Sequence, residues 1–213
     1  MAALLECEGA AALAVVYFSA GGRTAELAQV LAQAFTQAAA PLTTPTSKQW
    51  RARCVPIEGA DIHAGRYRNE AALAVVDQAA AVVLASPTYM GGPAAQFKAW
   101  ADASSERWAA RAWAGKWAAG LTTGSSPGGE LTCTLQYFQT FAAQHGMLWV
   151  PMSALRREGS KGHNRLGSGL GVAAWSDAAQ AHPADLRSAA LMGQQLAAQL
   201  NQRSCRFTYT LPD

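Results

Sequence analysis

The chain has 213 residues, of which 50% are hydrophobic and 15% are charged, and its formal net charge is +3. These values favour a folded chain with a sizeable core and argue against disorder. The Lys and Arg residues are scattered, which excludes the basic stripe typical of nucleic-acid-binding domains. No stretch approaches the roughly 18 uninterrupted apolar residues of a membrane helix, and Glu6 and Glu8 stand where a secretory leader carries Lys or Arg. We therefore expect a cytoplasmic protein without membrane insertion.

The cysteines and the chain organisation give further limits. Cys7, Cys54, Cys133 and Cys205 lie far apart without a Cys-x-x-Cys pair, so we expect reduced thiols rather than disulfides or a metal site. No internal repeat or interdomain linker is visible. We expect one domain over residues 1–213, with a core of about 11–202 and a strand-like tail at 203–213 whose place the sequence does not give.

Short apolar runs alternate with segments of helical periodicity. The apolar runs predict five strands, at 11–18, 50–57, 79–85, 116–122 and 147–152. The periodic segments predict helices at about 27–38, 69–76, 93–108, 129–144 and 183–200. Between the last strand and the last helix, residues 153–177 form a long, polar, Gly-rich segment that we expect to be a functional or mobile loop.

Five strands that are apolar on both sides and alternate with helices indicate an α/β fold, a parallel sheet covered on both faces. Right-handed crossovers place the helices on the two sides of such a sheet. Ligands of these sheets bind outside the carboxyl ends of the strands. The segments that follow the first, third and fourth strands are therefore the places to search for a site.

The segment after the first strand, Ser19 to Thr24 (SAGGRT), combines small and hydroxyl residues directly before a helix. Bare backbone amides and the helix dipole form an anion site there, to which Ser19 and Thr24 add hydroxyl groups. An ordinary glycine turn with a Ser or Thr cap explains the same residues equally well. The segment is neither G-x-G-x-x-G nor G-x-x-x-x-G-K-[ST], which disfavours a dinucleotide fold and a nucleoside-triphosphate loop.

Two further segments complete a candidate pocket. After the third strand, 86–93 (SPTYMGGP) places an aromatic residue and a Met between stiffening prolines, which suits a flat ring or merely a rigid turn. After the fourth strand, 122–129 (TTGSSPGG) offers hydroxyls and bare amides. Taken together, the three segments predict one composite pocket for a flat, phosphorylated, hydrogen-bonding ligand.

These motifs resemble the flavodoxin-like superfamily and, more narrowly, the WrbA-type NAD(P)H:quinone oxidoreductases. The resemblance rests on Tyr17–Ser19 with Gly22 and Thr24, then SPTYMGGPAAQFKAW, GKWAAGLTTGSSPGGE and the QHGM of 144–147, and it spans about 190 residues. It implies a three-layer sandwich with a five-stranded parallel sheet of order 2-1-3-4-5. The chain departs from the family at Gly21, at Tyr89-Met90 and in the segment 153–177.

The resemblance implies FMN as cofactor, NAD(P)H as electron donor and no metal. The residues implied to contact FMN are Ser19, Ala20, Gly21, Gly22, Arg23 and Thr24 at its phosphate, Pro87, Thr88, Tyr89, Met90 and Gly91 at its ring, and Thr122, Thr123, Gly124, Ser125 and Ser126 at the ring edge and ribityl chain. The resemblance also implies His145 beside the flavin as the catalytic residue. Trp108 is implied to close the substrate space near a subunit contact. From the residues alone, His145 is explained equally well as a histidine that ends a helix, and Trp108 as a tryptophan that packs at a helix end.

We therefore expect an FMN-dependent enzyme that reduces quinones by two electrons at the expense of NAD(P)H, as a homodimer or homotetramer. The alternative from another class is a flavodoxin-type one-electron carrier without a substrate of its own. Such carriers are typically strongly acidic, whereas this chain has 17 basic and 14 acidic residues. A third interpretation is a regulatory scaffold that has lost its flavin, which the intact loops disfavour.

Overall fold

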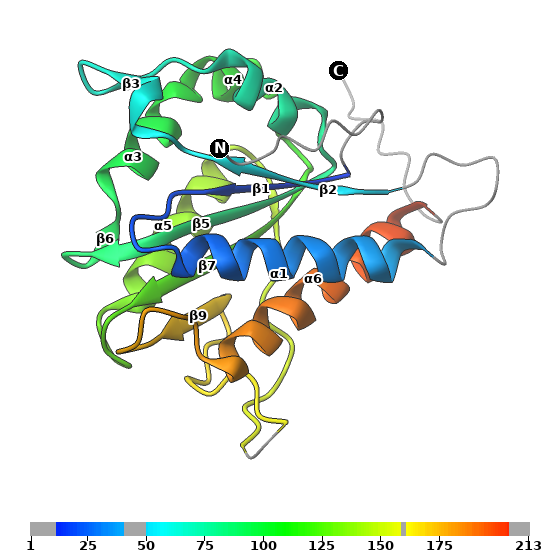
Figure 1. Ribbon diagram of the computed structural model, residues 1–213. Helices are drawn as coiled ribbons and strands as arrows, with labels where there is room; N and C mark the ends of the chain where they lie inside the picture. The colour runs from blue at the N-terminus through cyan, green and yellow to red at the C-terminus, as the bar shows by residue number, and fades with distance from the viewer. Residues whose placement is uncertain (1–11, 41–49, 159–160, 205–213) are drawn as a thin grey trace.

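A parallel sheet of order β2-β1-β5-β7-β8 forms the centre of the molecule, as the sequence predicts (Figure 1). The computed structural model describes residues 12–40, 50–158 and 161–204. All neighbours along this path are parallel. The bounds of the five strands are β1 Leu13–Tyr17, β2 Ala52–Pro56, β5 Ala81–Tyr89, β7 Trp117–Gly124 and β8 Leu148–Trp149.

Helices cover both faces of the sheet. One hydrophobic cluster joins α1 (Arg23–Ala39) and α6 (Pro183–Ser204) to one side of the strands, and a second joins α2 (Glu70–Gln78), α3 (Ala95–Ala103) and α5 (Leu131–Gln144) to the other. Within β1, Leu13 and Val15 belong to the first cluster and Ala14 and Val16 to the second. Successive side chains of a strand point to opposite faces, so a central strand such as β1 is apolar throughout.

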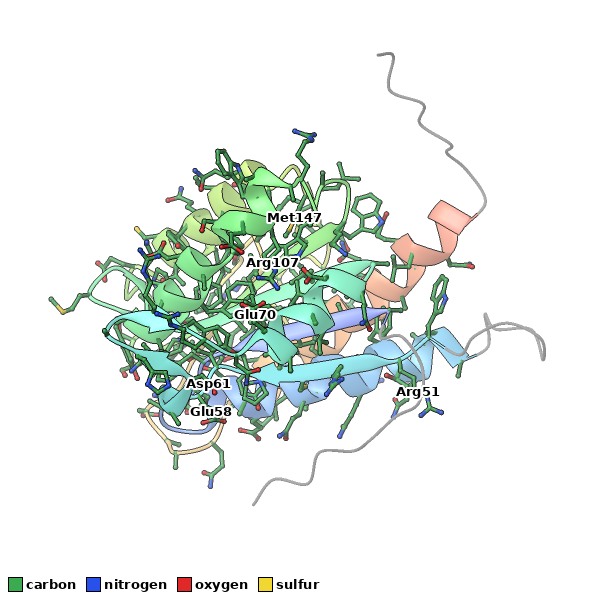
Figure 2. All side chains as sticks on the ribbon, turned by 90° about the horizontal axis from the view of Figure 1, so that it is seen from above. Arg51, Glu58, Asp61, Glu70, Arg107 and Met147 are labelled. Carbon is green, nitrogen blue, oxygen red and sulfur yellow. The ribbon has the colours of Figure 1, made fainter. Side chains whose placement is uncertain are left out.

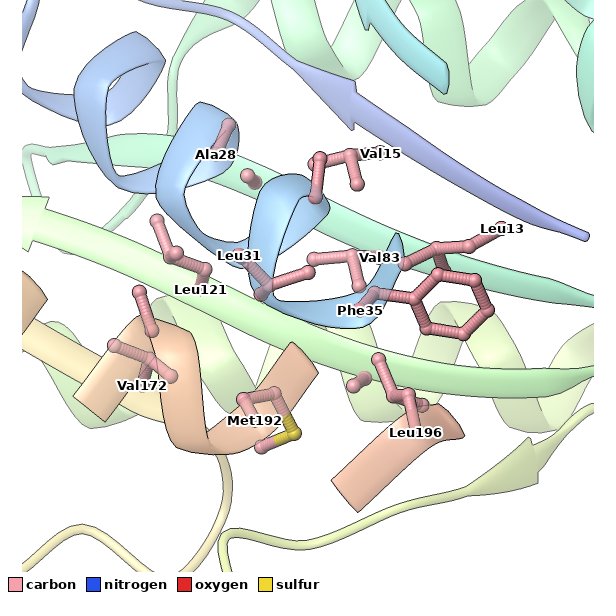
Figure 3. Packing of buried hydrophobic residues seen from close by; sticks show 14 of the residues in the cluster. Leu13, Val15, Ala28, Leu31, Phe35, Val83, Leu121, Val172, Met192 and Leu196 are labelled. Carbon is pink, nitrogen blue, oxygen red and sulfur yellow. The ribbon is translucent and has the colours of Figure 1, made fainter. Parts of the chain in front are cut away.

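The helices α1 and α6 lie side by side on one face and approach each other closely (Figure 1). Leu31 and Phe35 of α1 gather with Met192 and Leu196 of α6 over the sheet (Figure 3). A Cβ added at Gly193 would stand 2.3 Å from the carbonyl oxygen of Leu31. Glycine at this position therefore permits the backbones to meet, at the cost of its low helix propensity.

The fifth strand consists of two pieces, which corrects the expectation of one loop over 153–177. The short β8 pairs with the start of β7, whereas β9 (Val172–Trp175) pairs in parallel with its end, through Leu121↔Val172 to Gly124↔Trp175. The chain leaves the sheet after Trp149 and returns at Val172. We call the described residues between these two strands, 150–158 and 161–171, the excursion.

The excursion is tied to the rest of the molecule by buried polar contacts. Asn164 donates from its side chain to the carbonyls of Ala154 (2.7 Å) and Ser168 (3.1 Å), and its N–H donates to the hydroxyl of Ser188 on α6 (2.7 Å). Asn164 has a φ of 44°, in the left-handed region that Asn tolerates better than most residues. The two side-chain bonds hold the excursion together, and the bond to Ser188 fixes it against α6.

Two smaller regions differ from the sequence-based expectations. The helix expected over 93–108 is divided at Ser104 into α3 and α4 (Ser105–Ala109), and it is preceded by β6 (Gly92–Pro93). Between β2 and α2 the chain adds a 3₁₀ turn, η2 (Gly59–Asp61), and a small hairpin of β3 (Ile62–His63) and β4 (Arg66–Tyr67). The expected tail falls mostly outside the described residues. Within those residues, no helix is long and apolar enough to cross a membrane.

Candidate functional site

The loops that follow β1, β5 and β7 meet at the edge of the sheet where the parallel strands end, here called the carboxyl edge (Figure 1). They enclose a pocket of about 80 Å³. Every residue that lines this pocket belongs to the set predicted from the sequence. The lining residues are Ser19, Ala20, Gly21, Arg23, Thr24, Pro87, Thr88, Tyr89, Thr123, Gly124 and Ser125.

The first loop directs the start of α1 at the pocket. Gly22 caps the helix with a φ of 87°, and the hydroxyl of Ser19 accepts a hydrogen bond from the N–H of Ala25 (3.2 Å). The first amides of a helix have no partner within it, and they carry the positive end of its dipole. The guanidinium of Arg23, which donates to the carbonyl of Ser176, adds a full positive charge. This end of the pocket is suited to an anion.

Threonine hydroxyls lock the three loops to one another. Thr24 and Thr123 share a hydrogen bond of 2.9 Å, and Thr88 and Thr122 share one of 2.8 Å. Thr122 also donates to the carbonyl of Ser86 (2.8 Å) and is fully buried. Its hydroxyl therefore holds the second and third loops together, and Thr122 does not line the pocket.

The second loop is a β-hairpin rather than a simple strand-to-helix turn. β5 and β6 are antiparallel, and the two-residue connection of Met90 (φ 50°) and Gly91 (φ 79°) has both residues in the left-handed region. Two-residue hairpins favour this conformation because it matches the twist of the strands. Tyr89 lines the pocket with half of its surface exposed, and Met90 at the tip is fully exposed. The hairpin thus offers an aromatic face at the pocket rim.

The third loop leaves β7 at Gly124 and stays close to the pocket. A Cβ at Gly124 would lie 2.6 Å from Cδ2 of Leu131, so glycine lets the loop pass over the start of α5. Ser125 lines the pocket, whereas Ser126 lies next to Gly129 in the turn before α5. The third loop therefore supplies small polar groups without bulk.

His145 lies at the opposite edge of the sheet. It follows α5 and precedes β8, whose Leu148 pairs with Trp117 at the start of β7, whereas the pocket adjoins Gly124 at the end of that strand. The eight residues of β7 separate the two by roughly 20 Å. The expectation that His145 lies beside the three loops does not hold within this chain.

The imidazole of His145 is buried in an aromatic cluster. Its ring centroid lies 4.6 Å from that of Trp113 and 4.7 Å from that of Phe141. Nε2 shares a hydrogen bond of 2.9 Å with the hydroxyl of Ser104, and Nδ1 is buried without a partner. Burial lowers the pKa of His145 to about 4. This environment is typical of a neutral packing histidine.

Trp108 also lies away from the pocket of its own chain. It is on α4, which is joined to α2 through Arg107, whose guanidinium binds Glu70 (2.7 Å) and Asp77 (3.4 Å). Figure 2 shows Arg107 beside Glu70 on this side of the molecule. The indole of Trp108 is 55% exposed, so the residue belongs to the surface.

Sequence reasoning missed the part of the site that follows β9. Ser176 accepts from Arg23 and donates its N–H to the carbonyl of Gly124 (3.4 Å), so it contacts the first and third loops. The N–H of Ala181 donates to the carboxylate of Glu26 on α1 (2.9 Å). These contacts use backbone groups, for which a single sequence carries no signal. Among the described residues, no group of three or more His, Cys, Asp or Glu could hold a metal ion.

The comparisons with known proteins agree with this geometry. A family model described as NADPH-dependent FMN reductase matches residues 12–159. A protein of Pseudomonas aeruginosa (strain UCBPP-PA14) named flavodoxin FldP is 33% identical over 191 residues, which cover 86% of this chain and 93% of that protein. A solved structure described as a flavodoxin, WrbA-like protein from Agrobacterium tumefaciens has a TM-score of 0.67 and 29% identity, and the match covers 90% and 97% of the two chains.

A flavodoxin from the domain Archaea, at 13% identity and a TM-score of 0.58, covers 88% of this chain and 98% of its own and supports the fold alone. The α/β fold with its parallel sheet is thus that of the flavodoxins, and the expected FMN cofactor and oxidoreductase class agree with the matched family. Since the family model spans well over half of the sequence, this chain belongs to the NADPH-dependent FMN reductase family.

Proposed function

We propose that the protein is an FMN-dependent oxidoreductase of the WrbA-like kind, which takes electrons from NAD(P)H and reduces quinones by two electrons. The observation that carries the proposal is the convergence of three loops on one pocket at the start of α1. The donor set fits FMN, because amides, two hydroxyls and the Arg23 guanidinium suit a phosphate. The half-exposed Tyr89 suits a flat ring at the rim.

In this proposal each loop has one task. Ser19, Arg23 and Thr24 hold the phosphate, and Thr88 and Tyr89 border the ring. The end of β7 and the third loop contact the ring edge and ribityl chain, through Thr123, Gly124 and Ser125. Bound FMN supplies hydride and electron transfer, and the protein supplies binding, orientation and electrostatics. The hydrogen bond between Thr24 and Thr123 keeps the phosphate end and the ring end of the pocket in register.

A flavodoxin-type electron carrier is the second candidate function. It is favoured by the relative named flavodoxin FldP and by the exposed Tyr89 and Met90, which leave the pocket rim open to a protein surface. The placement of His145 away from the pocket removes one argument for an enzyme. The charge balance of 17 basic and 14 acidic residues favours the enzyme over an acidic carrier.

The deciding measurement is steady-state reduction of benzoquinone by NADH and by NADPH with the FMN-loaded protein. We expect turnover of about 1 per second or faster, as is typical of enzymes. The flavin-depleted protein gives the background. Turnover no faster than this background, together with flavin reduction in two separate one-electron steps during a titration, would establish the carrier instead.

We further propose that the protein self-associates through a surface that includes Trp108. Trp108 is a large exposed aromatic residue on α4, and such residues tend to mark interfaces. The resemblance to WrbA-type proteins implies a homodimer or homotetramer. We expect more than one subunit by light scattering at micromolar concentration, and Trp108→Ala is expected to shift the equilibrium toward monomer at least tenfold. Leu155→Ala, at another exposed apolar residue, serves as the control. A monomeric wild type would refute self-association, and an unchanged equilibrium in Trp108→Ala would remove Trp108 from the interface.

A further inference from the structure

A partly buried ion pair stands at the junction of the excursion, β9 and α6. The carboxylate of Asp185 is 1% exposed and accepts two hydrogen bonds from Arg165, at Oδ1 from Nε (2.8 Å) and at Oδ2 from Nη2 (2.7 Å). Arg165 belongs to the excursion and Asp185 to the first turn of α6. A bidentate arginine–carboxylate pair has a fixed geometry, so it joins these two segments rigidly.

The same pair holds the backbone of Trp175 at the end of β9. The N–H of Trp175 donates to Oδ2 of Asp185 (3.1 Å), and its carbonyl accepts from Nη2 of Arg165. The guanidinium of Arg165 also lies 4.8 Å from the centre of the indole ring, where a cation is attracted to the aromatic face. The N–H, the carbonyl and the indole of Trp175 thus each contact the Arg165–Asp185 pair.

The next residue, Ser176, connects the Arg165–Asp185 pair to the pocket. The carbonyl of Ser176 accepts from the guanidinium of Arg23, which lines the pocket at the start of α1. An arginine side chain has many rotamers and loses much of this freedom when it is fixed. A carbonyl held in place beforehand lets Arg23 be oriented before any ligand arrives, so less of that freedom is lost on binding.

We propose that Arg165 and Asp185 are positioning residues for the phosphate of FMN, and that the excursion places Arg165 for this purpose. The connection runs from the Arg165–Asp185 pair through Trp175 and the Ser176 carbonyl to the guanidinium of Arg23. The inference rests on the proposed binding of FMN and adds residues that do not touch the pocket. It predicts that the pair affects the phosphate end of the ligand and leaves the ring end unchanged.

The test compares FMN with riboflavin, which lacks the phosphate, by fluorescence quenching titrations of the flavin-free protein. Arg165→Gln is expected to weaken FMN about tenfold and riboflavin less than twofold. In a double-mutant cycle with Arg23→Gln, the Arg165 substitution is expected to weaken FMN by less than twofold, because its effect passes through Arg23. Arg187→Gln is the matched control, since Arg187 also joins α6 to the excursion, through the carbonyl of Gly162 (2.7 Å).

Removal of one partner of a buried ion pair can unfold a protein, so Arg165→Lys is the second variant. Lysine keeps the positive charge but cannot form the two parallel hydrogen bonds to Asp185. We expect the affinity for FMN to fall about threefold and the affinity for riboflavin to stay unchanged. A readout without flavin is the Nε–H resonance of Arg23, which is expected to broaden in both Arg165 variants and to stay sharp in Arg187→Gln.

Equal losses for FMN and riboflavin, additive effects in the cycle, or an unchanged Arg23 resonance would each refute the positioning role. If the wild-type protein bound no FMN at all, the proposed function would fail, and the Arg23 resonance would still decide whether the pair orients that side chain.

Discussion

Gly22→Asp is expected to abolish FMN binding while the fold stays intact. Gly22 precedes α1 at its cap position with a φ of 87°, and a Cβ there would meet no atom within 4 Å. A φ of 87° strains any side chain, but Asp tolerates positive φ better than most residues and is a favoured helix cap. The new carboxylate would, however, stand at the anion end of the pocket, where two like unit charges about 5 Å apart repel by about 3 kcal/mol at an effective dielectric constant of about 20. We expect the FMN affinity to fall at least a hundredfold.

Gly22→Asn separates charge from shape in this experiment. Asn is nearly isosteric with Asp, adopts the left-handed region and also caps helices, so it is expected to weaken FMN less than tenfold. Riboflavin, which carries no phosphate, should bind the two variants equally. If Gly22→Asp retained FMN with wild-type affinity, or if the Asn variant lost it equally, the assignment of the first loop to a phosphate would have to be abandoned.

The sequence was sufficient for the sheet because its three central strands, β1, β5 and β7, are buried over most of their length. A short run that is apolar throughout, such as AVVLA at 81–85, is typical of a strand in the interior of a sheet. Because helices separate the runs, a parallel sheet is the simplest arrangement of the strands. β9 escaped detection for the opposite reason. Its four residues, Val172–Trp175, follow a Gly-rich segment, and only the open side of β7 makes them a strand. Short strands depend on their neighbours more than on propensity.

The pocket was predictable because small residues at the carboxyl ends of parallel strands share one edge of the sheet. The same rule, applied to His145, places it correctly. A residue that precedes a parallel strand lies at the edge where strands begin, whereas the family resemblance implies a place beside the flavin. The pair of Arg165 and Asp185 had no such signal, because their contact depends on the path of the excursion. Polar residues 20 positions apart in a long loop and a helix do not reveal a partner.

The stability of the protein is expected to fall as the pH is lowered from about 6.5 to about 4, and His145 is the expected cause. Burial lowers the pKa of His145 from 6.5 to about 4 in the folded protein, so between these values the unfolded chain binds the proton and the folded protein does not. Stability rises with pH wherever the unfolded state binds more protons. The contribution of His145 is therefore complete above pH 6.5 and is lost progressively below it, by about 3 kcal/mol in total.

Urea unfolding at pH 7.5 and at pH 5 measures this effect, and His145→Gln is expected to reduce the difference between the two pH values by at least half. The amide of Gln can keep a hydrogen bond to Ser104 and does not titrate. His63→Gln, at an exposed hairpin residue, is the control and should keep the wild-type difference. Since His145 and the pocket lie at opposite ends of β7, FMN affinity is expected to stay within twofold of wild type in His145→Gln. A large loss of FMN affinity with an unchanged pH dependence would instead place His145 at a flavin site, which in this fold only the pocket of a second subunit could provide.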